Sequence, residues 1–297
     1  MTDRPTVRPV TLARLVELTN LCADGPLTTG DIETVLEVSH RRARETILEA
    51  VRIGLLAETT DAEETSAYET TSVGTTFLNA VREEAWSRVS DVLEEQSPHY
   101  QSFLEAVADV QPATPEKVLE RLCANHEDTQ YTFNQTSLDV LGDWGERLGA
   151  IQRNAFTGVY YRVNDFDEPN DFPEVLLTVF EEREETAGVN LRQRYLPIPE
   201  LREYTCERLR CTREVFDNAL VTLVGQNVGK LELSGAPMDT GAKDAALGIK
   251  EIARAETDGL VSTDQSTDRV MAGVEQYGKQ YYYLAVHDDT LTYKTQS

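Results

Sequence analysis

Residues 39–56 read SHRRARETILEAVRIGLL, a basic cluster followed by an amphipathic pattern. Ser39 suits the position just before a helix, because its hydroxyl accepts a hydrogen bond from a backbone N–H that has no partner within the helix. Small and apolar residues then recur at helical spacing, at Ala43, Ile47, Ala50, Val51 and Gly54. The stretch therefore predicts a helix with one buried face, and its basic end lies in a chain whose formal net charge is −24.

The segments on either side of this helix follow a recognisable order. Helices are predicted over residues 11–23, 29–37 and 75–95, and strands over residues 55–57 and 67–71. Asp24-Gly25-Pro26 ends the first helix, and a hydrophilic tip separates the two strands. The order is thus helix, helix, tight turn, helix and β-hairpin, closed by a long helix.

That order resembles the winged helix-turn-helix superfamily of small transcription regulators. The resemblance covers residues 11–96 and rests on pattern and spacing. It gives residues 39–53 the position of the recognition helix, which enters the major groove of DNA in helix-turn-helix proteins. The resemblance implies a mainly α fold with small β-wings (α+β), with residues 1–96 as the first unit.

The same order returns in the second half of the chain. Two helices and a strand are predicted over residues 199–208, 212–227 and 231–233. The step Leu209-x-x-Thr212 between these helices repeats the step Leu36-x-x-Ser39 between the earlier pair. A second winged-helix-like unit is therefore expected here.

A third, looser instance of the pattern lies between the other two. A helix is predicted over residues 133–148 and a hairpin over residues 150–163. Residues 164–172, NDFDEPNDF, form an acidic linker that contains proline. We therefore predict tandem winged helix-turn-helix units over residues 1–96, 97–165 and 172–297.

The end of the chain fits the pattern less closely. Residues 280–286, QYYYLAV, have the strongest strand composition in the chain. This strand either completes the sheet of the last unit or forms an edge for association. A helix is predicted over residues 241–255 and a polar loop over residues 258–268.

The net charge of the chain indicates the salt concentration of its surroundings rather than the kind of molecule that it binds. Asp and Glu number 52 against 28 Lys and Arg, and only six of the basic residues are Lys. Large net charge makes the compact state repel itself at low salt, whereas at molar salt the screening length falls to about 3 Å. The composition resembles that of haloarchaeal, halophilic proteins, and we expect the fold to require high ionic strength.

The apolar content of 40% is sufficient for a hydrophobic core. No apolar run approaches the roughly 18 residues of a membrane span, and the N-terminal residues have no signal-peptide pattern. The sequence therefore predicts a cytoplasmic protein that does not bind a membrane.

The basic helix end predicts contact with double-stranded DNA. Arginine guanidinium groups match guanine edges and phosphate oxygens, and the first residues of a recognition helix meet the bases. The candidate DNA-binding residues of the first unit are Ser39, His40, Arg41, Arg42, Arg44 and Arg52. The alternative is that these charges pair along the helix, Arg41 with Glu45 and Arg52 with Glu49.

The last unit has a weaker basic cluster around its own tight turn. Its candidate DNA-binding residues are Arg208, Arg210, Arg213 and Asn218. An Asn amide can bind adenine in a bidentate manner. The helix of the middle unit instead carries Asp139, Asp143 and Glu146, so that unit is expected to pack against protein.

Catalytic and metal-binding motifs give no positive signal. The chain has no P-loop, GxGxxG, HExxH or GxSxG pattern, so no enzyme activity and no cofactor are predicted. Cys123-x2-His126 and Cys206-x4-Cys211 together supply four ligands that zinc accepts. We expect no metal, because Cys206 and Cys211 are five apart near a helix end, where they should not share a face.

These observations predict a non-catalytic DNA-binding protein with tandem winged helices, either a transcription regulator or the DNA-holding subunit of a larger complex. The alternative is a scaffold whose winged helices dock a protein partner, such as an ATPase or polymerase-type subunit. A homodimer is compatible with either function. An exposed apolar patch at the last strand, without a basic face, would favour the scaffold.

Overall fold

The computed structural model describes residues 6–60, 65–124, 131–163, 169–186, 195–235 and 267–294. The chain forms two compact units. Unit 1 comprises Met1–Ile151 with Ala255–Ser262, and unit 2 comprises Gln152–Arg254 with Thr263–Ser297. The fold is mainly helical with small antiparallel sheets, as the sequence predicts.

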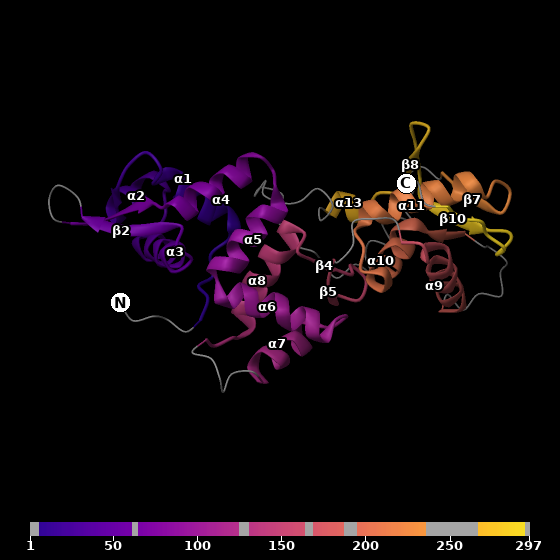
Figure 1. The fold of residues 1–297 in the computed structure, drawn as a ribbon, viewed down its shortest axis with the longest axis horizontal. Helices are drawn as coiled ribbons and strands as arrows, with labels where there is room; N and C mark the ends of the chain where they lie inside the picture. Colours follow the sequence, from indigo (N-terminus) through magenta and orange to yellow (C-terminus); the bar gives the residue numbers. More distant parts are fainter. Residues whose placement is uncertain are drawn as a thin grey trace. The chain divides into compact units, whose positions relative to one another are not determined.

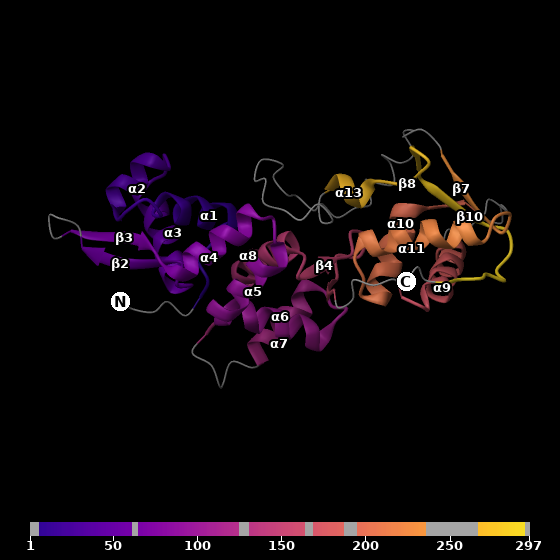
Figure 2. The same cartoon turned by 45° about the horizontal axis from the view of Figure 1, so that its top comes forward.

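The first half of unit 1 contains three helices and a three-stranded sheet. In chain order these are α1 (Leu12–Leu21), β1 (Leu27–Thr28), α2 (Thr29–Val35), α3 (His40–Arg52), β2 (Leu56–Thr60) and β3 (Ser66–Thr70). The strands are antiparallel in the order β1-β3-β2, with β3 in the centre. Figure 2 shows β2 and β3 extending as a hairpin from these helices. Strand β1 is too short to leave a sequence signal, and the sequence did not predict it.

The predicted stripe of α3 is largely buried. Ala43, Ile47 and Ala50 have no exposed surface, and Ile32 of α2 is equally buried. Val51 and Gly54 are only partly buried, so the buried face is narrower than predicted. Contacts of α3 with both α1 and α2 fix its back against the core, leaving its first turn open to solvent.

The predicted long helix over residues 75–95 is wrong, because it divides into α4 (Ser72–Arg82) and α5 (Trp86–Gln96). Glu84 adopts a left-handed backbone conformation with φ of 53°. The N–H of Ala85 then donates to the carbonyl of Ala80 at 2.9 Å, an arrangement that closes the end of a helix. Glycine or asparagine usually marks such an end, and here a glutamate takes that place.

A helical bundle follows in unit 1, made of α5 together with α6 (Pro98–Val110), α7 (Pro115–Ala124) and α8 (Gln135–Leu148). Residues 7–10, before the first helix, belong to this core. Val7 and Val10 are buried, and Trp144 of α8 donates its indole N–H to the carbonyl of Val10 at 3.1 Å. The segment before α1 is therefore anchored to a helix far along the chain.

Unit 2 begins within a hairpin and continues with three helices and a second sheet. Its hairpin is β4 (Ile151–Arg153) with β5 (Tyr160–Arg162), which the sequence predicts. Then follow α9 (Phe172–Thr186), β6 (Tyr195–Pro197), α10 (Ile198–Leu209), α11 (Arg213–Gln226) and β7 (Leu231–Ser234). The last elements are α13 (Thr267–Met271), β8 (Val274–Gln276), β9 (Lys279–Tyr281) and β10 (Tyr283–Val286).

The predicted strand over residues 280–286 completes the sheet of unit 2. It is divided between β9 and β10, and β10 lies in the centre of a sheet of order β6-β10-β7. The alternative of an association edge is therefore wrong, because both sides of β10 are paired. The predicted helix over residues 241–255 lies outside the described residues, as does the loop predicted at residues 258–268 except for its last two residues, which begin α13.

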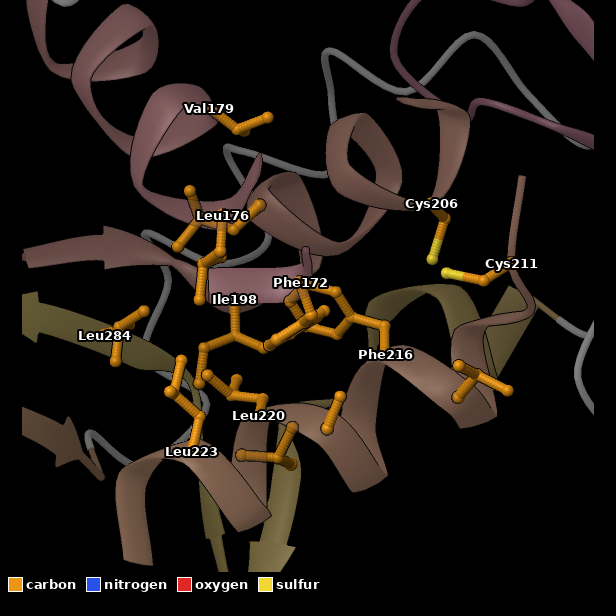
Figure 3. Close-up of a cluster of buried hydrophobic side chains, with 14 of the residues drawn as sticks. Phe172, Leu176, Val179, Ile198, Cys206, Cys211, Phe216, Leu220, Leu223 and Leu284 are labelled. Carbon is orange, nitrogen blue, oxygen red and sulfur yellow. The ribbon is translucent and has the colours of Figure 1, made fainter. Parts of the chain in front are cut away.

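The core of unit 2 lies between its three long helices and the central strand. Figure 3 shows Phe172 and Leu176 of α9, Phe216 and Leu220 of α11, and Leu284 of β10 around one apolar centre. Each of these side chains is almost completely buried. The ring of Phe172 meets that of Phe216 edge-on, with 5.5 Å between their centroids.

The three predicted units and the two observed units have different boundaries. The helices α6, α7 and α8 of the expected middle unit over residues 97–165 lie in unit 1. The boundary at residues 151 and 152 passes through strand β4, so most of the hairpin lies in unit 2. The prediction of a separate middle unit stays a prediction.

The two units share one order of elements. In unit 1 the order α1, β1, α2, α3, β2, β3 gives the sheet β1-β3-β2. In unit 2 the order α9, β6, α10, α11, β7, β10 gives the sheet β6-β10-β7, with α13, β8 and β9 inserted between β7 and β10. In each unit the last strand of the set lies between the other two. Figure 1 labels the three helices of each set, α1, α2 and α3 in unit 1 and α9, α10 and α11 in unit 2. The repeat noticed in the sequence is thus a repeat of topology.

Candidate nucleic-acid interface

The site begins where the chain enters α3. Ser39 is the N-cap, and its hydroxyl accepts a hydrogen bond from the N–H of Arg42 at 3.4 Å, as the sequence predicts. His40, Arg41 and Arg42 follow on the first turn and are exposed, and Arg44 is exposed on the second. The positive end of the helix dipole adds to the charge of these side chains.

Two of these residues are paired with neighbouring carboxylates. His40 Nδ1 lies 3.0 Å from Glu33 Oε2, and Arg41 Nε donates to Glu45 Oε1 at 3.1 Å. The pairing of Arg41 with Glu45 is the structural alternative that the sequence left open. The Arg41 side chain is nevertheless 88% exposed, so a ligand can reach its guanidinium.

The remaining two arginines are different. Neither Arg42 nor Arg44 has an ion pair or a side-chain hydrogen bond with any residue in the part of the chain that the structure describes. Most other arginines of the described ranges are paired, including Arg88 with Glu83 and Arg121 with Asp109. In a chain with nearly twice as many acidic as basic residues, two exposed arginines on either side of the buried Ala43, without carboxylate partners in the described residues, are a candidate anion-binding feature.

The prediction that Arg52 contacts DNA is wrong. Its side chain is only 12% exposed and turns toward the core, where Nε donates to Glu49 Oε2 at 3.2 Å. Its Nη1 also lies 2.6 Å from His99 Nδ1 on α6. Glu49 is completely buried and accepts hydrogen bonds from Arg8 as well. These contacts fix the last turn of α3 instead of presenting it to a ligand.

The β2–β3 hairpin of unit 1, the predicted wing, does not extend the basic surface. Tyr68 of β3 is 8% exposed, and the exposed charged residues of the two strands are Glu58 and Glu69. Within the described residues of unit 1, the positive charge of this region is therefore confined to the first two turns of α3.

The candidate residues of unit 2 have mixed positions. Arg213 is fully buried and is bound by Glu203 at 2.6 Å, so its predicted contact with DNA is wrong in this structure. Arg208 is partly exposed and paired with Glu182, and Arg210 is half-buried against the ring of Tyr161. Asn218 is exposed on α11, but the only basic side chain of that helix is the buried Arg213.

A buried charge network in unit 2 was missed by sequence reasoning. Arg202 donates to Asp217 at 2.7 Å, and Arg269 of α13 lies 2.6 Å from the other oxygen of the same carboxylate. Burial raises the pKa of Asp217, whereas the two neighbouring guanidinium groups oppose that rise. Because the chain has 80 charged residues, no pattern distinguishes these few buried charges from the exposed majority.

The expectation that Cys206 and Cys211 do not share a face is also wrong. Figure 3 shows their sulfur atoms directed toward one another. Arg210 between them adopts a left-handed conformation with φ of 57°, and this turn directs Cys211 back toward α10. Both thiols are buried, Cys123 is exposed, and His126 lies outside the described residues. Among the described residues, no three His, Cys, Asp or Glu side chains are grouped as metal ligands.

The positions of the thiols predict their reactivity. Burial raises the pKa of Cys22 to about 11, and burial also raises that of Cys206. Because the thiolate is the reactive form, we expect a maleimide reagent to label only Cys123 rapidly in the folded chain. Mass spectrometry after brief labelling should show one modified cysteine, and the other three only after denaturation. Rapid labelling of Cys206 without denaturant would contradict this assignment.

Exposed apolar side chains do not gather at the last strand. The large ones in the described residues come from four different segments, at Val35, Tyr195, Val228 and Tyr277. On β10, Leu284 and Ala285 are buried, and the two flanking residues are partly buried. The apolar patch that would favour a protein scaffold is thus not found on β10.

No protein-family model matches the sequence, and no curated protein matches it either. No helix in the described part of the chain has the length and apolar character needed to cross a lipid bilayer.

Proposed function

We propose that the chain is a non-catalytic protein that binds double-stranded DNA through the first two turns of α3, as a transcription regulator or as a DNA-holding subunit. In this proposal residues 1–96 form a winged helix-turn-helix unit and α3 is its recognition helix. Arg42 and Arg44 make the principal contacts, and Ser39, His40 and Arg41 lie beside them.

One observation carries the proposal, which is the exposure of Arg42 and Arg44 without carboxylate partners among the described residues. Their guanidinium groups can bind a guanine edge or a phosphate without first breaking an ion pair, which lowers the cost of binding. Arg41 would have to exchange Glu45 for the ligand, at a cost of only about 0.3–0.5 kcal/mol for such a surface pair.

The acidic residues of the proposed wing limit which elements of unit 1 can contact DNA. Glu58 and Glu69 on the wing strands would repel phosphates, so the proposed contact relies on the helix rather than on the wing. A protein scaffold remains the alternative, but the scattered exposed apolar residues and the paired β10 give it no specific surface.

The test is the double substitution Arg42→Ala and Arg44→Ala. We expect it to weaken binding to a fluorescein-labelled pool of random duplexes about 100-fold, since each hydrogen bond from a guanidinium to a charged phosphate contributes about 1.5–3 kcal/mol. Fluorescence anisotropy should be measured in a KCl series that begins at molar concentration. If both arginines contact phosphates, the dependence of log K on log salt should also fall in slope by about two.

The matched control is the double substitution Arg88→Ala and Arg121→Ala, which removes the same charge from an exposed position on α5 and a partly exposed one on α7. Its affinity should stay within a factor of a few of the wild type. Equal affinities of the two double variants would refute the role of α3, and the protein scaffold would then be the better function.

A further inference from the structure

We infer that α11 is the counterpart of α3, and that the face by which α3 is proposed to bind DNA serves in unit 2 as a docking surface for the chain's own β4–β5 hairpin and α13. The chain then has one DNA-binding helix rather than two. The statement that the chain has one DNA-binding helix rests on the proposed function. The correspondence of α11 with α3 and the docking surface rest only on the fold.

The tight turns before the two helices establish the correspondence. In unit 1, Leu36 is followed by Glu37 with φ of 51°, and Ser39 caps α3. In unit 2, Leu209 is followed by Arg210 with φ of 57°, and Thr212 caps α11. Both turns thus place a non-glycine residue in the left-handed region at the same position, and both end in a hydroxyl N-cap.

The buried faces of the two helices correspond as well. Counted from the N-cap, the fourth, eighth and eleventh residues are buried in both helices. They are Ala43, Ile47 and Ala50 in α3, and Phe216, Leu220 and Leu223 in α11. Because the register of the buried face is the same, the outward positions of the two helices can be compared residue by residue.

The outward positions differ in what covers them. The first residue after the cap is His40 in α3, with a side chain 65% exposed, and Arg213 in α11, with a side chain 1% exposed. The fifth is the exposed Arg44 in α3 and Asp217 in α11, with a side chain 12% exposed. The first and fifth positions of α11 are therefore enclosed within unit 2, whereas Glu214 at the second position stays exposed.

The β4–β5 hairpin covers the first of these positions. Arg213 donates to the carbonyl of Arg153 at 3.0 Å, and its guanidinium also binds Glu203 of α10. Glu203 in turn accepts the N–H of Ala155 at 2.8 Å, and Asn154 donates to Glu207 at 2.5 Å. The hairpin is thus held by charged groups from both α10 and α11.

The short helix α13 covers the second position. Arg269 pairs with Asp217 at 2.6 Å, and Arg202 of α10 donates to the carbonyls of Arg269 and Val270 at 3.3 Å each. Val270 is almost fully buried and packs beside Ala155. Asp217 therefore binds a segment of its own chain at the position where α3 presents Arg44 to solvent.

Substitution of Arg269 tests the docking surface without disturbing the centre of the network. Arg269→Ala should increase the hydrogen-exchange rate of peptides that cover residues 269–272 at least tenfold, while peptides from α3 are unaffected. The control is Arg183→Ala in the same unit, which removes an ion pair of similar exposure, Arg183 with Glu200. No change near α13, or the same change in the control, would overturn the docking surface.

Substitution of Arg213 tests the hairpin contact. Arg213→Ala should lower the melting temperature of unit 2 by about 10 °C, because it leaves the buried Glu203 without its partner. If that variant does not fold, Arg213→Lys keeps the charge, and its peptides covering residues 153–157 should still exchange faster than those of the wild type. Unchanged melting and unchanged exchange would overturn the inference.

The single DNA-binding helix is tested with the exposed positions of α11. Replacing Glu214 and Asn218 with alanine should leave the affinity for the duplex pool within twofold, whereas replacing Arg42 and Arg44 weakens it. A loss with the α11 variant as large as that with the α3 variant would overturn the inference. If the wild type binds no duplex, the proposed function fails, and the exchange measurements still decide the docking surface.

Discussion

Replacing Glu49 with glutamine is expected to destabilise unit 1 by about 3–5 kcal/mol, since Arg8 and Arg52 would then lose the carboxylate that compensates their charge. Glu49 is completely buried on the back of α3, and Arg8 and Arg52 are both largely buried beside it. Urea unfolding followed by circular dichroism measures the change in the free energy of unfolding.

The control for this prediction lies one turn earlier on the same helix. Glu45 pairs with the highly exposed Arg41, so Glu45→Gln should cost no more than about 0.5 kcal/mol. If the two glutamate variants have the same stability, the buried pairs of Glu49 contribute little, and packing alone fixes α3.

Replacing Gly74 with alanine is expected to cost about 3 kcal/mol, although alanine is the better helix former by about 1 kcal/mol. A Cβ at this position would lie 2.3 Å from the carbonyl oxygen of Leu55 and 2.8 Å from Thr70 Cγ2. The first of these is a backbone atom of the residue just before β2, so it cannot move without displacing β2. Thermal unfolding of the variant measures the effect.

Gly30 provides the opposite case in the same unit. It is also in a helix, and its added Cβ would meet only Thr28 Oγ1 at 3.8 Å. Gly30→Ala should therefore stabilise unit 1 by about 0.5–1 kcal/mol. Opposite signs for the two variants are the expected result, and a stabilised Gly74→Ala protein would show that α4 does not approach Leu55 so closely.

The elements best predicted from the sequence are those with local signals. Ser39 and Thr212 cap α3 and α11 as expected, and each helix has an apolar face at the expected spacing. The hairpin β2–β3 and the strand β7 follow from composition in the same way. Such signals depend on a few neighbouring residues, so they need no knowledge of the fold.

The elements that were missed depend on contacts between distant segments. The break at Glu84 has a left-handed residue that is not glycine, and the two-residue strand β1 exists only because β3 lies beside it. Nothing in the sequence distinguishes Arg213 and Arg52 from exposed arginines. In the structure, Arg213 pairs with the buried Glu203, and Arg52 pairs with the buried Glu49. For the candidate site, the exposed first turn of α3 could therefore be predicted from the sequence, whereas the burial of these two arginines could not.

The central position of β10 has a consequence for the order in which the two sheets form. In unit 1, β3 pairs with a strand that precedes it by a short hairpin, whereas in unit 2, Tyr283 of β10 must reach Ser234 across a long intervening segment. The segment that joins the two paired strands is longer in unit 2 than in unit 1 by about three doublings of its length. Each doubling costs about 0.6 kcal/mol of chain entropy when the segment closes. The sheet of unit 1 can therefore form while unit 2 still lacks its central strand, and in that interval the inner edges of β6 and β7 lack their partner and are open to pairing with another chain.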